Sequence, residues 1–149
     1  MKRWITCVAF VMFLGSLAQA QCNPKIEAFT KQSGFTFKSD PKCKFWVTFE
    51  ALSIPRDGMQ GAVLIGEQED VIVLGAVVKL KANLNLSSAT LAKLLHLNHE
   101  LDFVKVGIDN DGDLFLRAEL HKASLDVAAL KDAFERVQEG SQKVYDATQ

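Results

Sequence analysis

Three aspartates at alternate positions could together bind a metal ion. They are Asp109, Asp111 and Asp113, in the stretch VGIDNDGDLFL. A calcium loop of the helix-loop-helix type places oxygen ligands at positions 1, 3 and 5, a glycine at 6 and a bidentate glutamate at 12. Counted from Asp109, positions 6 and 12 are Leu114 and Leu120, so the glycine and the closing ligand are both missing. The spacing therefore argues against a calcium loop.

A β-hairpin gives the same stretch a structural role. A three-residue loop over residues 110–112 places Ile108 opposite Leu114 and keeps one face of the two strands apolar throughout. A two-residue turn would split the apolar residues between the two faces. The longer loop also needs a left-handed residue as its third member, and Gly112 occupies that position. We therefore predict a hairpin, with a weakly bound cation at its tip as an open alternative.

Three histidines are the other candidate metal ligands or general bases. His96 and His99 lie three residues apart before Glu100, whereas the zinc protease motif H-E-x-x-H has histidines four apart with the glutamate between them. His121 follows a predicted strand, and the chain contains no G-x-S-x-G nucleophile motif, no G-x-G-x-x-G and no phosphate loop. A metal-binding or hydrolytic protein that uses these histidines and residues 109–113 is the alternative hypothesis. The main hypothesis has no cofactor, no metal and no catalytic residue.

The first twenty residues are typical of a bacterial export signal. Lys2 and Arg3 precede an uncharged apolar run over residues 4–17, and residues 18–20 (AQA) fit the site that signal peptidase cleaves. The apolar run is shorter than the roughly 20 residues that a membrane-spanning helix needs. We expect cleavage after Ala20 and a product exported to the periplasm or the medium, with a single domain over residues 21–149.

Two of the three cysteines would remain in the exported product. Cys7 leaves with the signal, so Cys22 and Cys43 are the expected pair in an oxidising compartment. Their separation differs from the C-x-x-C of redox enzymes, which favours a structural disulfide. In the chain-entropy model, closing a loop of about 20 residues contributes roughly 3 kcal/mol to stability.

The spacing of apolar residues predicts helices and strands in a definite order. Asn23-Pro24 starts a short helix that ends at Ser33-Gly34. The predicted strands cover residues 43–49, 61–66 and 71–80, the hairpin supplies two more, and the predicted long helices cover residues 87–101 and the chain after Ser124. The order is therefore helix, three strands, helix, two strands, helix.

Several faces of these elements can be assigned from the pattern. In the first strand, Cys43, Phe45, Val47 and Phe49 alternate with an outward-facing set, which is Lys44, Trp46, Thr48 and Glu50. The strand over 71–80 is nearly continuous in Val, Ile and Leu, so we expect it in the centre with both faces covered. The helix over 87–101 carries one leucine stripe, which is Leu91, Leu94, Leu95 and Leu101.

Exposed aromatic residues are the candidate partner contacts. An open sheet side that carries aromatic side chains would suit a dimer mate or a bound peptide. The candidates are Phe35, Phe37, Trp46 and Phe115, with Phe115 lying across Gly107. Alternatively, the helices cover all four aromatic residues.

Residues 94–145 resemble a known family. The stretch LLHLNHELDFVKVGIDNDGDLFLRAELHKASLDVAALKDAFERVQEGSQKVY is similar to the YbjN family and, more distantly, to class I type III secretion chaperones. The resemblance implies an α+β domain with an antiparallel sheet packed against helices, often dimeric and without enzymatic activity. In the secretion chaperones, apolar patches hold extended segments of a client. Those chaperones work in the cytoplasm without an export signal, so the signal and the Cys22–Cys43 pair depart from their pattern.

These observations lead to one expected function. We expect an exported, non-enzymatic protein-binding domain, chaperone-like or regulatory, that binds a partner protein or itself as a homodimer. The expected mechanism is burial of apolar groups on an exposed sheet face, with strand pairing at a free edge. The net charge of −1 provides no basic surface for nucleic acid, and we expect no membrane association after signal cleavage.

Overall fold

The computed structural model describes residues 22–149, and the predicted export signal over residues 1–20 lies outside them. The helices are α1 (Pro24–Gln32), α2 (Ser88–Glu100) and α3 (Val127–Ala147). The strands are β1 (Lys38–Ser39), β2 (Phe45–Thr48), β3 (Val63–Glu67), β4 (Val71–Lys79), β5 (Lys105–Ile108) and β6 (Leu114–His121). Two short 3-10 turns, Lys81–Asn83 and Lys122–Ser124, follow β4 and β6. No helix within residues 22–149 is both long enough and apolar enough to span a membrane.

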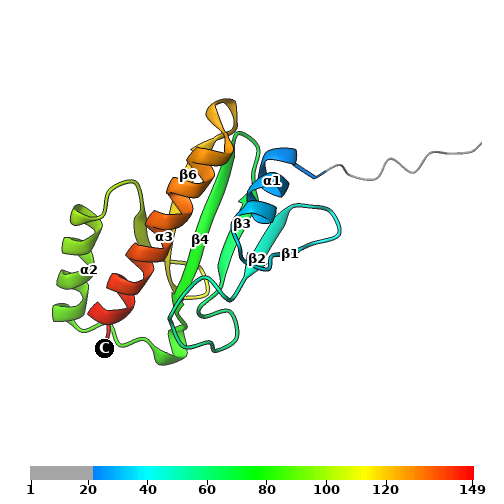
Figure 1. The fold of residues 1–149 in the computed structure, drawn as a ribbon. Helices are drawn as coiled ribbons and strands as arrows, with labels where there is room; N and C mark the ends of the chain where they lie inside the picture. Colours follow the sequence, from blue (N-terminus) through cyan, green and yellow to red (C-terminus); the bar gives the residue numbers. More distant parts are fainter. Residues whose placement is uncertain (1–21) are drawn as a thin grey trace, which may run out of the picture.

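The six strands of the described chain form one antiparallel sheet in the order β1-β2-β3-β4-β6-β5 (Figure 1). This is the predicted α+β fold with the predicted order of elements, and the two-residue strand β1 is an addition at one edge. β4 lies inside the sheet between β3 and β6, as its apolar run predicted. The hairpin of β5 and β6 has the predicted register, with Ile108 opposite Leu114.

Helices cover one face of this sheet in the described chain. Along β4, buried residues alternate with half-buried ones, and the buried set is Ile72, Leu74, Ala76 and Val78. The expectation that β4 is covered on both faces is therefore wrong. The second face of β4 carries Val71, Val73 and Val77, so composition alone did not reveal which face the helices cover.

α3 is the main cover of the sheet. It lies along β4 and β6 (Figure 1). The side chain of its N-cap residue, Asp126, accepts a hydrogen bond from the amide of Ala129 at 2.7 Å. Its buried apolar side chains include the predicted Leu130, Phe134, Val137 and Val144. α1 packs against α3 and buries Ile26 and Phe29. These two helices therefore complete the core on one side of the sheet.

α2 stands beside the sheet, where it contacts α3 and β5 (Figure 1). The Ser87 hydroxyl caps it by accepting a hydrogen bond from the amide of Thr90 at 3.1 Å. The predicted leucine stripe lies only partly in the core: Leu94 is buried, whereas Leu91 and Leu95 are exposed, Leu95 by 71%. α2 therefore presents apolar side chains to its surroundings.

Candidate partner-binding surface

The uncovered side of the sheet forms an apolar surface that we call the open sheet face. Its apolar side chains are Phe45, Val47, Leu64, Val73, Val77 and Phe115. The strand register places them together, because Val47 is opposite Leu64 and Val77 is opposite Phe115. Phe45 is 45% exposed, and the other five are half-buried. Large apolar groups that water reaches on a contiguous surface are typical of a binding site.

Two glycines on the open sheet face differ in the space that surrounds them. Gly75 lies opposite Leu64 and Arg117 in the interior of the sheet, and a side chain there would find only ordinary contacts with the backbone of Leu116 and with Arg117. Gly107 differs, because a Cβ at this position would lie 2.8 Å from Cζ of Phe115. The Phe115 ring therefore lies across Gly107, as the hairpin register predicted.

The direction of β2 corrects the main sequence prediction about contact residues. Trp46 is only 3% exposed and lies opposite Ile65 in the core, and Thr48 is buried as well. Phe45 and Val47, which were expected in the core, point to the open sheet face. The expectation that Trp46 faces outward is therefore wrong. The alternation itself was visible in the sequence, but it does not say which set is inside.

Phe35 and Phe37 also lie elsewhere than predicted. Both are half-buried and pack in the helix layer against Phe134 of α3, with ring centroids 5.5 and 6.1 Å from its centroid. Phe29 of α1 completes this aromatic cluster at 5.4 Å from Phe134. Of the four predicted contact residues, Phe115 is the one on the open sheet face, and its role in binding remains a prediction.

Charged side chains occupy the β5–β6 end of the open sheet face. Arg117 pairs with Glu119 at 3.0 Å, and Lys105 approaches the same carboxylate at 3.8 Å. These pairs are exposed, so each contributes at most about 1 kcal/mol to stability. In the described residues the buried Nε of Arg117 has no hydrogen-bond partner.

The β5 edge of the sheet is partly closed to strand pairing. The side-chain oxygen of Asn98 on α2 accepts a hydrogen bond from the amide of Val106 at 2.9 Å. At the other edge, β1 has only two residues. Short or capped edges limit the pairing of additional strands, so the open sheet face is a better candidate for partner contact than either edge.

The aspartates of the β5–β6 hairpin act as turn residues. The Asp109 carboxylate accepts hydrogen bonds from the amides of Asp111 and Asp113, at 3.0 and 2.9 Å. Asp113 in turn accepts from the amide of Lys81 at 2.7 Å, which ties the hairpin to the turn after β4. Gly112 has the expected left-handed conformation, with φ of +90°. Two of the three carboxylates are thus engaged by backbone amides.

Gly112→Val is expected to lower the free energy of unfolding by about 1–2 kcal/mol, because a β-branched residue is strained at positive φ. Asp111→Ala at the exposed tip is expected to change it by no more than about 0.5 kcal/mol. Urea denaturation of the two variants measures both effects. A larger loss for Asp111→Ala would contradict the assignment of this stretch as a turn and return attention to metal binding.

The histidines do not form a common site. His96 and His99 line a shallow hollow on α2 with Ala92 and Leu95, whereas His121 ends β6 beside Val71. Within residues 22–149, no group of three or more His, Cys, Asp or Glu side chains is placed to hold a metal ion. The apolar side chains around His96 and His99 make this hollow more suitable for protein contact than for hydrolysis.

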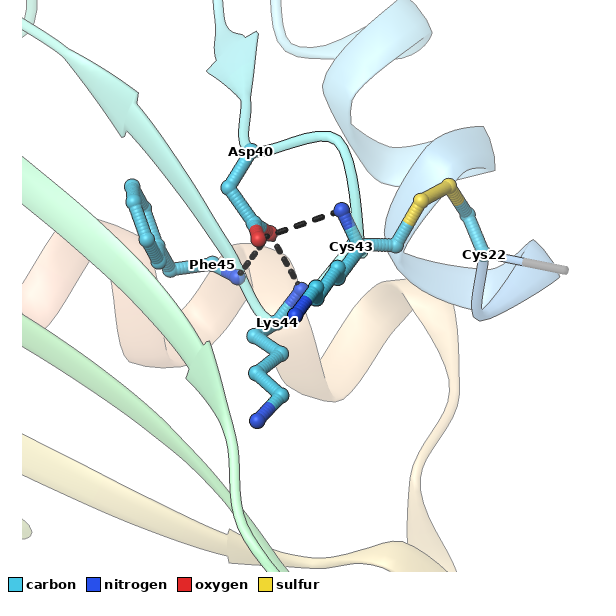
Figure 2. Close-up of a disulfide and its surroundings, with 6 residues drawn as sticks. Cys22, Asp40, Cys43, Lys44 and Phe45 are labelled. Atoms are coloured by element: carbon cyan, nitrogen blue, oxygen red, sulfur yellow. Dashed lines mark hydrogen bonds between the residues drawn. A yellow bond between two sulfur atoms is a disulfide. The ribbon is translucent and has the colours of Figure 1, made fainter. Parts of the chain in front are cut away.

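Cys22 and Cys43 are joined by a disulfide that links the start of α1 to the turn before β2 (Figure 2). The Asp40 carboxylate organises this turn by accepting hydrogen bonds from the amides of Lys42, Lys44 and Phe45. Desolvation raises the pKa of Asp40, but these hydrogen bonds and the charge of Lys44 outweigh it and hold this pKa below its ordinary value of 3.8. The turn is therefore held by a covalent bond and a carboxylate.

This architecture, a six-stranded sheet with its helices on one face, is the fold of the type III secretion chaperones. A chain of the heterodimeric complex ExoU-SpcU from the type III secretion system of Pseudomonas aeruginosa is similar, with a TM-score of 0.60 and 23% identity over 83% of this chain and 98% of that chain. A chain of the HopA1-SchA chaperone-effector complex has a TM-score of 0.58 and 12% identity, over 83% of this chain and 91% of that chain. YbjN from E. coli has a TM-score of 0.58 and 16% identity, over 83% and 89%.

The chain belongs to the YbjN family. The family model, described as "Putative bacterial sensory transduction regulator", matches residues 25–149. No curated protein sequence matches the chain. The family and the fold that were expected from residues 94–145 are thus confirmed, and the match extends well beyond those residues, to 25–149.

Proposed function

We propose that this protein is an exported, non-enzymatic binding domain that holds an apolar segment of another protein against the open sheet face. The observation that carries the proposal is the exposed Phe45, surrounded by valine and leucine side chains on the uncovered side of the sheet. Burial of such groups would stabilise a complex by about 25 cal/mol for each Å² of apolar surface removed from water. Chaperone–effector and heterodimeric complexes among proteins of the same fold support a protein as the ligand.

The charged end of the face suggests the chemistry of the bound segment. Arg117 and Lys105 outnumber Glu119 there, and their side chains are 43% and 68% exposed. An apolar segment with a carboxylate near Arg117 would therefore complement the face in both shape and charge.

Photo-crosslinking at Phe45 tests the proposed surface. A photoreactive phenylalanine analogue at position 45 is expected to crosslink a partner in the native host, because this position would be covered in the complex. The matched control is the same analogue at Met59, which is 41% exposed but lies in the loop between β2 and β3. Equal crosslinking at both positions, or crosslinking from Met59 alone, would refute binding at the open sheet face.

The exposed leucines of α2 favour a second candidate contact, which is self-association. Leu91 and Leu95 are exposed by 44% and 71%, and Leu95 lines a hollow with Ala92, His96 and His99. A second copy of the chain that packed its own α2 there would bury the same leucines from both sides. This surface belongs to a different element from the open sheet face, so a dimer would leave that face available.

Leu95→Ser is expected to weaken such a dimer at least about tenfold, because burying one leucine side chain is worth roughly 1.5–3 kcal/mol. Lys93→Ser on the same helix is the control, since it is exposed and does not line the hollow. Light scattering over a range of protein concentrations measures the association of both variants. A wild-type protein that stays monomeric throughout this range would exclude the dimer.

A further inference from the structure

We propose that the Cys22–Cys43 disulfide is an exchangeable redox site, which a dithiol opens from a hollow beside Cys22, and that opening it releases the turn that leads into β2 at Phe45. The chemical partner of the site is thus a dithiol or its disulfide, as in a thiol–disulfide exchange protein. The consequence for binding rests on the function proposed above, whereas the exchange and the release of the turn do not.

The hollow borders Cys22, one of the two cysteines of the disulfide. It has a volume of about 480 Å³, is open to solvent and is lined by residues at the start of α1, at the end of β3 and in the turn after β6. Cys22 lies in its lining and Cys43 does not. Both cysteines are half-buried, so the side from which each can be reached decides which is attacked. The geometry selects Cys22.

Charges around the hollow favour the anion that carries out the attack. Lys25 and Lys122 both line it, against one carboxylate, that of Glu67. Glu67 pairs with Lys122 at 2.8 Å, and the Lys25 ammonium group donates a hydrogen bond to the carbonyl of Leu125. Because a carbonyl group carries no net charge, this hydrogen bond leaves the positive charge of Lys25 uncompensated. Positive charge beside a cysteine stabilises thiolates, which are the reactive species in exchange.

The exchange balances with a dithiol as the reductant. One thiolate of the dithiol attacks Sγ of Cys22, a mixed disulfide forms at Cys22, and the Cys43 thiolate leaves and takes up a proton. The second thiolate of the dithiol then attacks the mixed disulfide, closes its own disulfide and releases Cys22, which is also protonated. The protein gains two electrons and two protons, and the dithiol loses the same. Oxidation of the two cysteines is the reverse sequence.

The turn that the disulfide holds has few other attachments. Cys43 is in the left-handed region with φ of +54°, which is unfavourable for a residue other than glycine. The strand before the turn, β1, has two residues and lies at the edge of the sheet beside β2. The turn is also held by the hydrogen bonds of Asp40, whose carboxylate lies toward Lys44 and Phe45 (Figure 2), and by the amide of Glu67 in β3, which donates to the carbonyl of Lys44 at 2.8 Å. The disulfide therefore stabilises a conformation that local sequence does not favour.

Release of the turn would reach the open sheet face directly. Phe45 follows Cys43 by two residues, and its ring extends to the opposite side of the turn from the disulfide (Figure 2). The amide and carbonyl of Phe45 are both bound by Asp40, so the turn and the pairing of Phe45 with Gly66 of β3 together set the position of this residue. Segments with few stabilising contacts open independently of the rest of a fold. Reduction is thus expected to free one end of the binding surface and the start of α1.

Two single variants test which sulfur exchanges. In the full chain with Cys7→Ser, Cys43→Ser leaves Cys22 as the free thiol and Cys22→Ser leaves Cys43. With glutathione disulfide as the probe, mass spectrometry is expected to show the mixed disulfide forming at Cys22 at least about tenfold faster than at Cys43. Equal rates, or faster reaction at Cys43, would overturn the assignment of the hollow as the entry route.

Hydrogen exchange of the oxidised and the dithiothreitol-reduced protein tests the release. If reduction only lowered the global stability, hydrogen exchange would accelerate equally at all amides that exchange through complete unfolding. We expect instead that exchange at the amides of α1 and of residues 44–47 accelerates at least about tenfold more than exchange at those of β4 and β6. Because a local opening exposes little surface, this faster exchange is expected to be insensitive to dilute urea. Uniform acceleration, or none, would overturn the proposal.

Crosslinking at position 45 in the two redox states separates this inference from the proposed function. Crosslinks that form in the oxidised protein and weaken on reduction support both. Local exchange with crosslinks in neither state would refute binding at the open sheet face and leave the redox site supported. Crosslinks of equal yield in both states would refute the effect of the disulfide on binding.

Discussion

Phe134→Ala is expected to lower the free energy of unfolding by about 3–5 kcal/mol, the largest single-residue effect that we predict. Phe134 is 3% exposed and lies at the centre of the aromatic cluster, within about 6 Å, ring to ring, of Phe29, Phe35 and Phe37. Truncation leaves a cavity between α1 and α3 and removes three ring contacts at once. Because α1 is short, it cannot close over the cavity without losing its own buried side chains.

Phe103→Ala is the control for this measurement. Phe103 is 52% exposed, and the guanidinium of Arg136 lies 5.8 Å from its ring centroid. Its truncation is expected to cost less than about 1 kcal/mol. Equilibrium urea denaturation of both variants gives the comparison. Similar losses for the two would show that the aromatic cluster is not the centre of the helix layer.

Gly61→Ala is expected to lower the free energy of unfolding by about 2–3 kcal/mol, although it adds a single methyl group. Gly61 has φ of +79°, and a Cβ there would lie 3.1 Å from the carbonyl oxygen of Ile54. That oxygen belongs to the backbone of a loop anchored by the buried side chain of Ile54, so it cannot move aside easily. The substitution therefore adds a steric conflict to an unfavourable backbone conformation.

Gly34→Ala separates these two contributions. Gly34 also has φ of +79°, but a Cβ there has no atom within 4 Å. The effect of alanine on the unfolded chain is the same at both positions, so it cancels in the comparison. Gly34→Ala is expected to cost about 1 kcal/mol. A thermal or urea denaturation series in which the two variants lose equal stability would contradict the packing of Gly61 against the loop.

The two candidate contact surfaces have different physical characters. The open sheet face is broad and contains Phe45 and Phe115, with charged groups at one end. The α2 surface is narrow and consists mainly of Leu91 and Leu95. Aromatic and arginine side chains are enriched among residues that dominate binding energy. The open sheet face is therefore the better candidate for a client and the α2 surface for a second copy.

Local features of the sequence predicted much of the fold. The cap at Ser87, the start of α1 after Asn23 and the register of the β5–β6 hairpin all depend on residues within a few positions of one another. The hairpin was predictable because one register keeps a face apolar and places Gly112 where a left-handed residue is required. The family and fold followed from residues 94–145, which contain this hairpin between two helices.

Orientation relative to the core was less predictable. In β2, both alternating sets contain large side chains, so Phe45 and Trp46 were assigned to the wrong faces. In α2, all leucines of the stripe have similar chemistry, and only the position of α3 and β5 decides that Leu94 is buried while Leu95 is exposed. The sequence pattern of one element gives the spacing of its apolar residues, and the element that packs against it determines which set of residues is buried.

The sequence by itself determined the elements, their order, the turn at Gly112 and the family, because these depend on short-range backbone preferences and on apolar periodicity. Only the tertiary structure decided that the helices cover one face of the sheet, which exposes Phe45 and buries Trp46. It also placed the Cys22–Cys43 disulfide beside a solvent-open hollow and against the turn that positions Phe45. Such relations join residues far apart in the chain, and they exist only once the layers have packed.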